Sequence, residues 1–194
     1  MRYTITFFSY WHCGTGLSGG FGIDQIVIRN RDGLPFIPGK TLKGLLRDAA
    51  ENLKEIHIQD NVQWEEFITT VFGTREGAAQ PGFRSSCCFF SDGIPGDDLQ
   101  RVLREEPFLV PHLYRTLAST SITDKGLAKK ATLRVKEAVI PLTLHAEIKG
   151  FPDDGGEKEK IIKCMQWVKR LGVCRNRGMG RCQFVPVAEG GEEI

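Results

Sequence analysis

The order of apolar and polar positions in the first forty residues favours extended structure. Aromatic and β-branched residues dominate 3–10, which predicts a first strand. Five glycines then occur within 14–22, a composition typical of a mobile or closely approached backbone. Residues 23–28 alternate imperfectly and predict another short extended segment. Because 34–39 contains two prolines, no helix is expected there.

Helical periodicity begins after these prolines. We predict that Thr41 caps a helix that runs to about Lys54. Its apolar positions recur at spacings of three, four and seven residues, at Leu42, Leu45, Leu46, Ala49 and Leu53. Similar patterns predict helices over 64–72, 98–105 and 157–171. Strand-like patterns occupy 84–90, 138–148 and 182–187.

The resulting order is strand, helix, strand, strand, helix, strand, with insertions. It predicts an α+β fold of the ferredoxin-like type, in which two helices cover one face of an antiparallel sheet. We expect a single domain over 1–187 and a flexible acidic tail over 188–194. The insertions lie near 14–33, 55–83 and 116–136, and long loops on a rigid scaffold often carry function.

Composition limits the function classes without choosing among them. The 194-residue chain is 41% hydrophobic and 26% charged, ordinary values for a soluble globular protein. Its formal net charge of +2 does not by itself indicate a nucleic-acid partner, so such a site depends on where the cations gather. Six cysteines without a Cys-x-x-Cys pair indicate reduced thiols rather than a zinc site. No apolar run is long enough to predict a membrane span, and we expect a cytoplasmic protein.

The first basic cluster lies where an extended segment enters the helix after Pro38. Its residues are Lys40, Thr41, Lys43 and Arg47. A helix N-terminus presents unpaired N–H groups and a partial positive charge, which favours a phosphate. Added lysines would make a backbone-binding site without base specificity. The alternative is an ordinary capped helix with solvated basic side chains.

Two further basic clusters lie in connecting segments. One connects the last helix to the last strand and contains Arg175, Arg177, Gly178, Gly180 and Arg181. Its arginines supply charge-assisted donors to phosphate, and its glycines allow close backbone approach. A simple helix C-cap at Gly172 is the alternative. The other is the polar segment 116–136, which contains Lys125, Lys129 and Lys130.

Together these segments resemble the RAMP superfamily, the RNA-binding proteins of CRISPR effector complexes. Residues 38–47 read Pro-Gly-Lys-Thr-Leu-Lys-Gly-Leu-Leu-Arg, similar to the signature run that opens the first helix of that family. Residues 172–180 match its C-terminal glycine-rich loop as Gly-x5-Gly-x-Gly. Residues 120–129, Thr-Ser-Ile-Thr-Asp-Lys-Gly-Leu-Ala-Lys, followed by Leu133 and Glu137, are similar to the thumb of type III backbone subunits.

The resemblance implies a ferredoxin-like palm with a guide CRISPR RNA lying across it. Copies of the subunit, or homologous effector subunits, would stack along the guide, and each thumb would distort the duplex formed with a complementary target RNA. Base pairing would then supply the sequence recognition, while basic loops hold phosphates. We expect the cations of the helix start and of the glycine loop to converge on one sugar–phosphate strand.

Asp24 is the sharpest candidate for catalysis. It lies in Gly20-Phe21-Gly22-Ile23-Asp24-Gln25-Ile26-Val27-Ile28, which is similar to the Gly-x-x-Asp-x-x-Val-Ile loop whose aspartate type III backbone subunits require for target cleavage. There the ribose 2′-hydroxyl attacks the neighbouring phosphate, with a divalent metal such as Mg or Mn. Only Asp32 is a further carboxylate nearby in sequence. The alternatives are that Asp24 caps a loop turn, or that the subunit only scaffolds RNA.

His12 motivates a third reading. It follows the first strand, where guide-processing endonucleases of the same superfamily often place a histidine, and its ordinary pKa suits acid–base chemistry near neutral pH. A packing role is the alternative.

Among the aromatic residues, Phe21 and Phe83 are candidates for stacking on bases. Trp64, Phe67 and Phe72 have the spacing of a buried helix face.

Overall fold

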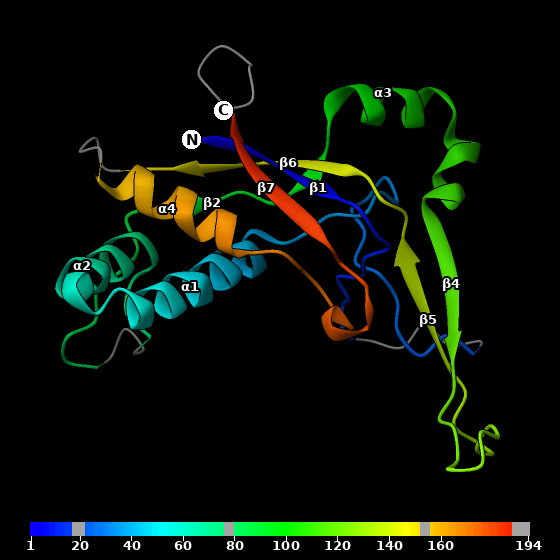
Figure 1. The fold of residues 1–194 in the computed structure, drawn as a ribbon. Coiled ribbons are helices and arrows are strands. Elements are labelled where there is room, and N and C mark those ends of the chain that lie inside the picture. The colour runs from blue at the N-terminus through cyan, green and yellow to red at the C-terminus, as the bar shows by residue number, and fades with distance from the viewer. Residues whose placement is uncertain (17–21, 76–79, 152–155, 188–194) are drawn as a thin grey trace.

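The chain folds as an antiparallel sheet with helices packed on one face and a separate two-stranded ribbon at one end (Figure 1). The computed structural model describes residues 1–16, 22–75, 80–151 and 156–187. Its strands are β1 (Arg2–Phe7), β2 (Phe89–Phe90), β3 (Ile94–Pro95), β4 (Tyr114–Ser119), β5 (Arg134–Val139), β6 (Thr143–Lys149) and β7 (Cys182–Val187). Its helices are α1 (Gly39–Ile56), α2 (Asn61–Phe72), α3 (Asp97–Glu105) and α4 (Gly156–Trp167). Short 3-10 turns are η1 (Ile58–Asp60), η2 (Pro107–Leu113) and η3 (Arg175–Arg177).

The main sheet has the strand order β2-β6-β1-β7, and β3 also pairs with β6. All of these pairings are antiparallel, with Ile5 of β1 opposite Leu144 of β6 on one side and Phe184 of β7 on the other. In chain order the elements β1, α1, β2, β6, α4 and β7 reproduce the predicted strand, helix, strand, strand, helix, strand. The ferredoxin-like α+β prediction is confirmed.

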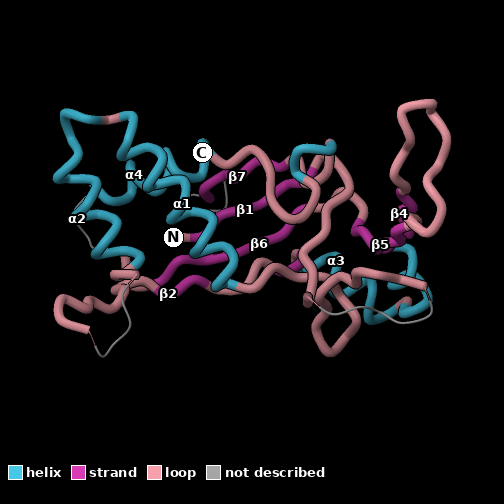
Figure 2. The backbone as a smooth tube through the Cα atoms, turned by 90° about the horizontal axis from the view of Figure 1, so that it is seen from below, coloured by secondary structure: helices cyan, strands magenta, loops and turns pink. Residues whose placement is uncertain are grey.

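One face of the sheet carries the core. Figure 2 shows α1 and α4 lying across the strands, with α2 beside them. Alternate residues of β1, Tyr3, Ile5 and Phe7, are buried toward these helices, as expected for a strand with one packed face. The predicted stripe of α1 is buried at Leu42, Leu46, Ala49 and Leu53 and half-buried at Leu45. The prediction that Trp64, Phe67 and Phe72 pack in the core is also confirmed.

Three predicted boundaries were wrong. Only Phe89–Phe90 of the segment 84–90 forms a strand. The segment 138–148 is divided between β5 and β6, because Pro141 cannot donate to a ladder and the chain turns there. Helix α4 ends at Trp167, four residues before the predicted end, because the chain then turns to run beside β7, where the N–H of Cys182 donates to the carbonyl of Lys169 at 3.0 Å.

The start of α1 is also a correction. Thr41 does not cap the helix: Pro38 occupies the N-cap position, no side chain caps the helix from there, and Gly39 is already helical. The N–H of Gly39 instead donates to Asp92 Oδ1 at 2.7 Å, from the turn between β2 and β3. A side chain at position 39 would clash with the carbonyl of Phe90. The sheet edge therefore fixes where this helix begins.

Strands β4 and β5 form a separate two-stranded sheet, Tyr114 opposite Val139 and Ser119 opposite Arg134. Isolated bridges join β5 to Trp11 and Gln25. This hairpin leaves the body on the side away from α2 (Figures 1 and 2). It coincides with the insertion predicted over 116–136. The single-domain boundary at 187 stays a prediction, and the predicted acidic tail over 188–194 lies outside the described residues. Among the described helices, none has the length and apolarity needed to cross a bilayer.

Replacing Asp92 by alanine removes the acceptor for the first N–H of α1, so we expect the free energy of unfolding to fall by about 1–2 kcal/mol. Asp92→Asn keeps a side-chain oxygen and should lose less than half of that. Urea unfolding followed by circular dichroism measures both. Equal losses in the two variants would contradict a role for this acceptor.

Candidate nucleic-acid interface

The tip of the β4–β5 hairpin is an ordered, basic loop. The N–H of Thr123 donates to the carbonyl of Leu127 at 2.7 Å, and the N–H of Lys129 donates to the carbonyl of Ser121 at 2.8 Å. The Thr120 and Thr132 hydroxyls hydrogen-bond across the loop at 2.8 Å. The predicted cations Lys125, Lys129 and Lys130 are all exposed here. The loop therefore presents its charges on a defined backbone.

The same tip exposes aliphatic side chains. Ile122, Leu127 and Leu133 all project into solvent. Exposed large apolar residues beside lysines are typical of a surface that meets a partner rather than water alone. The hairpin tip thus combines positive charge with apolar wedges.

Glu137 of β5 holds the base of the hairpin to the preceding loop. Its side chain is only 13% exposed. Its Oε2 accepts the N–H of Val27 at 3.0 Å, and its Oε1 pairs with the Arg29 guanidinium. Its own N–H donates to the carbonyl of Gln25 at 2.9 Å. Glu137 thus binds the loop to the hairpin at three residues, two through its carboxylate and one through its backbone N–H.

Arg29 completes this contact with an aromatic partner. Its guanidinium carbon lies 3.8 Å from the ring centroid of Tyr114, at the start of β4. The Tyr114 hydroxyl donates to the carbonyl of Gly33 at 2.6 Å, and burial raises the pKa of Tyr114 to about 12. The phenol therefore stays neutral and remains a donor at physiological pH.

Asp24 lies beside β5 with its side chain exposed. Its N–H donates to the carbonyl of Val135 at 2.7 Å, and its Oδ2 accepts the N–H of Val135 at 2.6 Å. The carboxylate thus faces solvent beside β5, near the end of the ribbon that leads to the tip, while one oxygen anchors the loop. Asp32 lies elsewhere: its N–H donates to Asn30 Oδ1 at 3.0 Å. No contact joins the two carboxylates.

His12 is buried, at 1% exposure. Its Nδ1 lies 2.6 Å from the carbonyl of Glu137, and its Nε2 packs against Gly14, where a Cβ would be 2.5 Å away. This placement matches the packing alternative. An RNA phosphate cannot reach the ring without movement of the surrounding chain.

The glycine loop packs against the segment that follows β1. The N–H of Val173 donates to the carbonyl of His12 at 3.0 Å, and the N–H of Gly180 donates to the carbonyl of Tyr10 at 2.8 Å. A side chain at Gly172 would clash with His12, whereas one at Gly178 would meet open space. The predicted close approach is therefore largely to the protein's own backbone.

Lys136 joins this loop to the hairpin. Its Nζ donates to Cys174 Sγ at 2.9 Å, and Cys174 has a left-handed backbone with φ of 60°. The adjacent Arg175, Arg177 and Gly178 are exposed. The bond from Lys136 to Cys174 therefore connects two basic segments. One is the glycine loop with its exposed arginines, and the other is the hairpin with its lysines.

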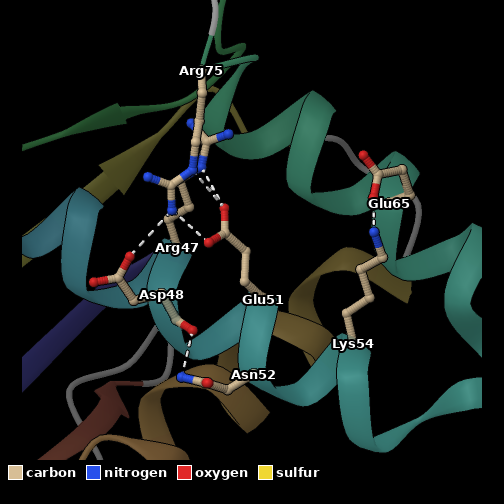
Figure 3. Close-up of polar contacts among 7 residues, drawn as sticks. All are labelled: Arg47, Asp48, Glu51, Asn52, Lys54, Glu65 and Arg75. Atoms are coloured by element: carbon tan, nitrogen blue, oxygen red, sulfur yellow. Dashed lines mark hydrogen bonds and ion pairs between the residues drawn. The ribbon is translucent and has the colours of Figure 1, made fainter.

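The cations of α1 have a different environment (Figure 3). Arg47 donates to Glu51 at 3.0 Å, and Arg75 pairs with the same carboxylate and with Asp48. The hydrogen bond from Arg75 lowers the pKa of Glu51 most. Arg47 is only 16% exposed and has its charge balanced, so it is a poor phosphate ligand.

Lys40 and Thr41 are exposed, whereas Lys43 is half-buried with its ammonium 6.0 Å from the Phe90 ring centroid. Burial, and next the charge of Arg47, lower the pKa of Lys43. Phe90 is on β2, one edge strand, while Arg181 adjoins β7, the other edge. Lys43 thus lies toward one edge strand and Arg181 toward the other. The expected convergence of the six cations on one sugar–phosphate strand stays a prediction.

Metal and stacking candidates complete the site. Within the part of the chain that the structure describes, no group of three or more His, Cys, Asp or Glu side chains is arranged to hold a metal. Of the two predicted stacking residues, Phe83 is exposed in a turn, and Phe21 lies outside the described residues. Lys136 and Glu137 were missed as an organising pair. The signal that would have found them is an adjacent pair of opposite charges between the apolar residues Val135 and Ala138 of a strand.

Glu137→Ala should lower the free energy of unfolding by about 2–3 kcal/mol, because the N–H of buried Val27 and the Arg29 guanidinium lose their acceptor. Glu137→Gln keeps one acceptor and should lose about 1 kcal/mol. Hydrogen exchange is expected to accelerate first in residues 25–29 of the alanine variant. Unchanged exchange there would refute this anchoring role.

Comparisons with known proteins identify the family and agree with the fold. The model of the RAMP superfamily matches residues 4–183. A solved type III-B Cmr-beta chain, bound to cognate target RNA, superposes with a TM-score of 0.63 at 13% identity, over 94% of this chain and 95% of that one. The apo state of type III-B Cmr-beta gives 0.63 at 14% identity with the same coverage. Among curated protein sequences there is no significant match. Because the family model matches nearly the whole length of the chain, the chain belongs to the RAMP superfamily.

Proposed function

We propose that this protein binds guide RNA as a backbone subunit of a type III RNA-guided effector complex, and that Asp24 takes part in cutting the paired target RNA. Family membership supports an RNA ligand, and one structural neighbour is a type III-B Cmr-beta assembly bound to cognate target RNA. Other effector subunits, or copies of this chain, would be its protein partners.

The link from Lys136 to Cys174 is the observation that carries the RNA-binding proposal. It fixes the glycine loop, with Arg175 and Arg177, against the hairpin, whose tip bears exposed lysines. A sugar–phosphate strand crossing from one segment to the other would meet cations along its path, with guanidinium groups as charge-assisted donors. Lys40 and Lys43 would meet RNA at a second point, near the β2 edge.

The hairpin tip has the chemistry of a wedge in a duplex. Ile122, Leu127 and Leu133 are exposed among lysines, so they can enter between unstacked bases while the cations hold the backbone. Stacked subunits would then interrupt the guide–target duplex at regular intervals. Base pairing would supply the sequence recognition, because aliphatic side chains and lysines that contact phosphates do not distinguish one base from another.

Asp24 stands at the foot of this wedge, where the distorted target strand would lie. In the proposed reaction the ribose 2′-oxygen bonds to the adjacent phosphorus, the bond from phosphorus to the 5′-oxygen breaks, and the 2′-hydroxyl proton leaves as the 5′-oxygen gains one. The products are a 2′,3′-cyclic phosphate and a 5′-hydroxyl. Asp24 would orient the 2′-hydroxyl through the carboxylate edge not bonded to Val135.

The described residues offer a divalent ion one carboxylate here, that of Asp24. This donor set fits magnesium or manganese only in its usual mode with nucleic acids, where substrate phosphate and water complete the shell. Such an ion would supply charge neutralisation at the phosphate when bound.

A scaffold without cleavage activity is the second candidate. The bond from the N–H of Val135 to Asp24 favours it, because an anchoring role alone accounts for an aspartate at this position. The guide-processing alternative required an accessible His12, and the buried ring gives it no support.

Asp24→Asn separates the two candidates. An asparagine side-chain oxygen still accepts the N–H of Val135, so the fold should be kept. The affinity for RNA should stay within about twofold of that of the unmodified chain. Loss of the carboxylate should slow target cleavage at least about 100-fold in the reconstituted complex. Product analysis on denaturing gels, with assembly checked by native electrophoresis, measures this. Undiminished cleavage by Asp24→Asn would leave only the scaffold.

Phosphate contact by the glycine loop predicts a change in salt dependence. For Arg175→Gln with Arg177→Gln, the slope of log affinity against log salt for single-stranded RNA should shrink by about 1 to 2. The loss should be uniform across RNA sequences. The matched control is Arg101→Gln with Arg104→Gln on α3, which removes the same charge elsewhere and should leave most of the slope unchanged. Equal effects in the two variants would place the RNA away from the glycine loop.

A further inference from the structure

We propose that an unpaired RNA base stacks on Phe8, in a basic cavity beside the start of β7. This proposal rests on the proposed function, since it names how that RNA is held at a point no motif marks. Phe8 directly follows β1 and is 48% exposed, whereas its neighbour Phe7 is buried against Trp11. The Phe8 ring is therefore not part of the core.

The cavity has the size and lining of a small-ligand site. It measures about 450 Å³, within the usual range for such pockets, and is lined in part by Phe8, Lys169, Arg181, Gln166 and Gln183. Aromatic carbon offers a stacking face, the two cations suit a phosphate, and the amides suit a base edge. No carboxylate is among the described residues that line it.

The ring and its cation are held in place by the backbone. The Arg181 guanidinium carbon lies 5.4 Å from the Phe8 ring centroid. The N–H of Phe8 donates to the carbonyl of Arg181 at 2.8 Å, and the N–H of Arg181 donates to Ser9 Oγ at 2.9 Å. β1 and β7 run side by side here (Figure 1). A platform ordered before binding loses less conformational entropy when a base arrives.

Charge distinguishes a nucleotide from other occupants. Lys169 and Arg181 line the cavity from two adjacent chain segments, which are bridged between Arg170 and Arg181. The charged residues that line the larger groove of about 1080 Å³, beside α3, are one arginine and four carboxylates, whose net negative charge would repel a phosphate: Arg2, Asp92, Asp97, Asp98 and Glu147. Of these two concave sites, only the one at Phe8 combines an exposed ring with cations.

The location also fits a strand that passes the glycine loop. Arg181 is the last residue of that loop, and Gly180 bonds to Tyr10, two residues after Phe8. If Arg175 and Arg177 hold an RNA, its next unpaired nucleotides would therefore lie near Phe8. Stacking is tolerant of base identity, as a backbone subunit requires.

The test compares two probes: a fluorescein-labelled uridine homopolymer RNA and an abasic RNA of the same length. Unmodified protein should bind the base-containing RNA more tightly in fluorescence anisotropy. Phe8→Ala should weaken that binding roughly 5- to 100-fold while leaving the abasic affinity unchanged. Phe8→Tyr should retain the preference and Phe8→Leu should lose it, since leucine is apolar but has no π face.

Phe108→Ala is the matched control, because Phe108 in η2 is 65% exposed with no guanidinium over its ring. It should bind both probes as the unmodified chain does. If the unmodified chain prefers bases and Phe8→Ala keeps that preference, stacking at Phe8 is wrong while RNA binding stands. If the unmodified chain binds neither probe, and binds no guide RNA in the assembled complex, the proposed function itself fails.

Discussion

Two adjacent side chains of β5, Lys136 and Glu137, hold the candidate surface together. Successive residues on a strand point to opposite sides, so this dipeptide reaches two different segments at once. Lys136 bonds to Cys174 of the glycine loop, while Glu137 bonds to Val27 and Arg29 of the loop beside the hairpin. Neither loop has a ladder of its own in the described residues. These two side chains add to the backbone bonds that also join the Asp24 loop to the hairpin, such as the one from the N–H of Asp24 to the carbonyl of Val135.

The distribution of charge matters more to this protein than its total. Around α1 and α2, opposite charges are paired: Arg47 and Arg75 share Glu51, and Lys54 pairs with Glu65 (Figure 3). Such exposed pairs add little stability, but they cancel the field that would attract a phosphate. The exposed cations of the hairpin tip and the glycine loop form no ion pair within the part of the chain that the structure describes. A nearly neutral chain can thus present one strongly basic surface.

Rigid and adaptable parts have separate roles in this arrangement. The main sheet and its helices contain the buried core, and Asp92 ties the first helix to the sheet edge. The hairpin contributes almost nothing to that core beyond its base, so its tip is defined by its own hydrogen bonds. Because the exposed aliphatic residues of the tip are not part of the buried core, the domain can carry them without losing core packing.

Local pattern alone determined the ferredoxin-like order, the buried stripe of α1 and the three basic segments, because periodicity and glycine or proline placement act over a few residues. It misplaced the cap of α1, since the acceptor Asp92 comes from a turn far along the chain. Only the tertiary structure decided that Lys43 and Arg181 lie at opposite edges of the sheet, that His12 is buried and that Phe8 is not. Strand order and side-chain burial depend on pairings between residues distant in sequence, and no local pattern encodes which partner a strand will meet.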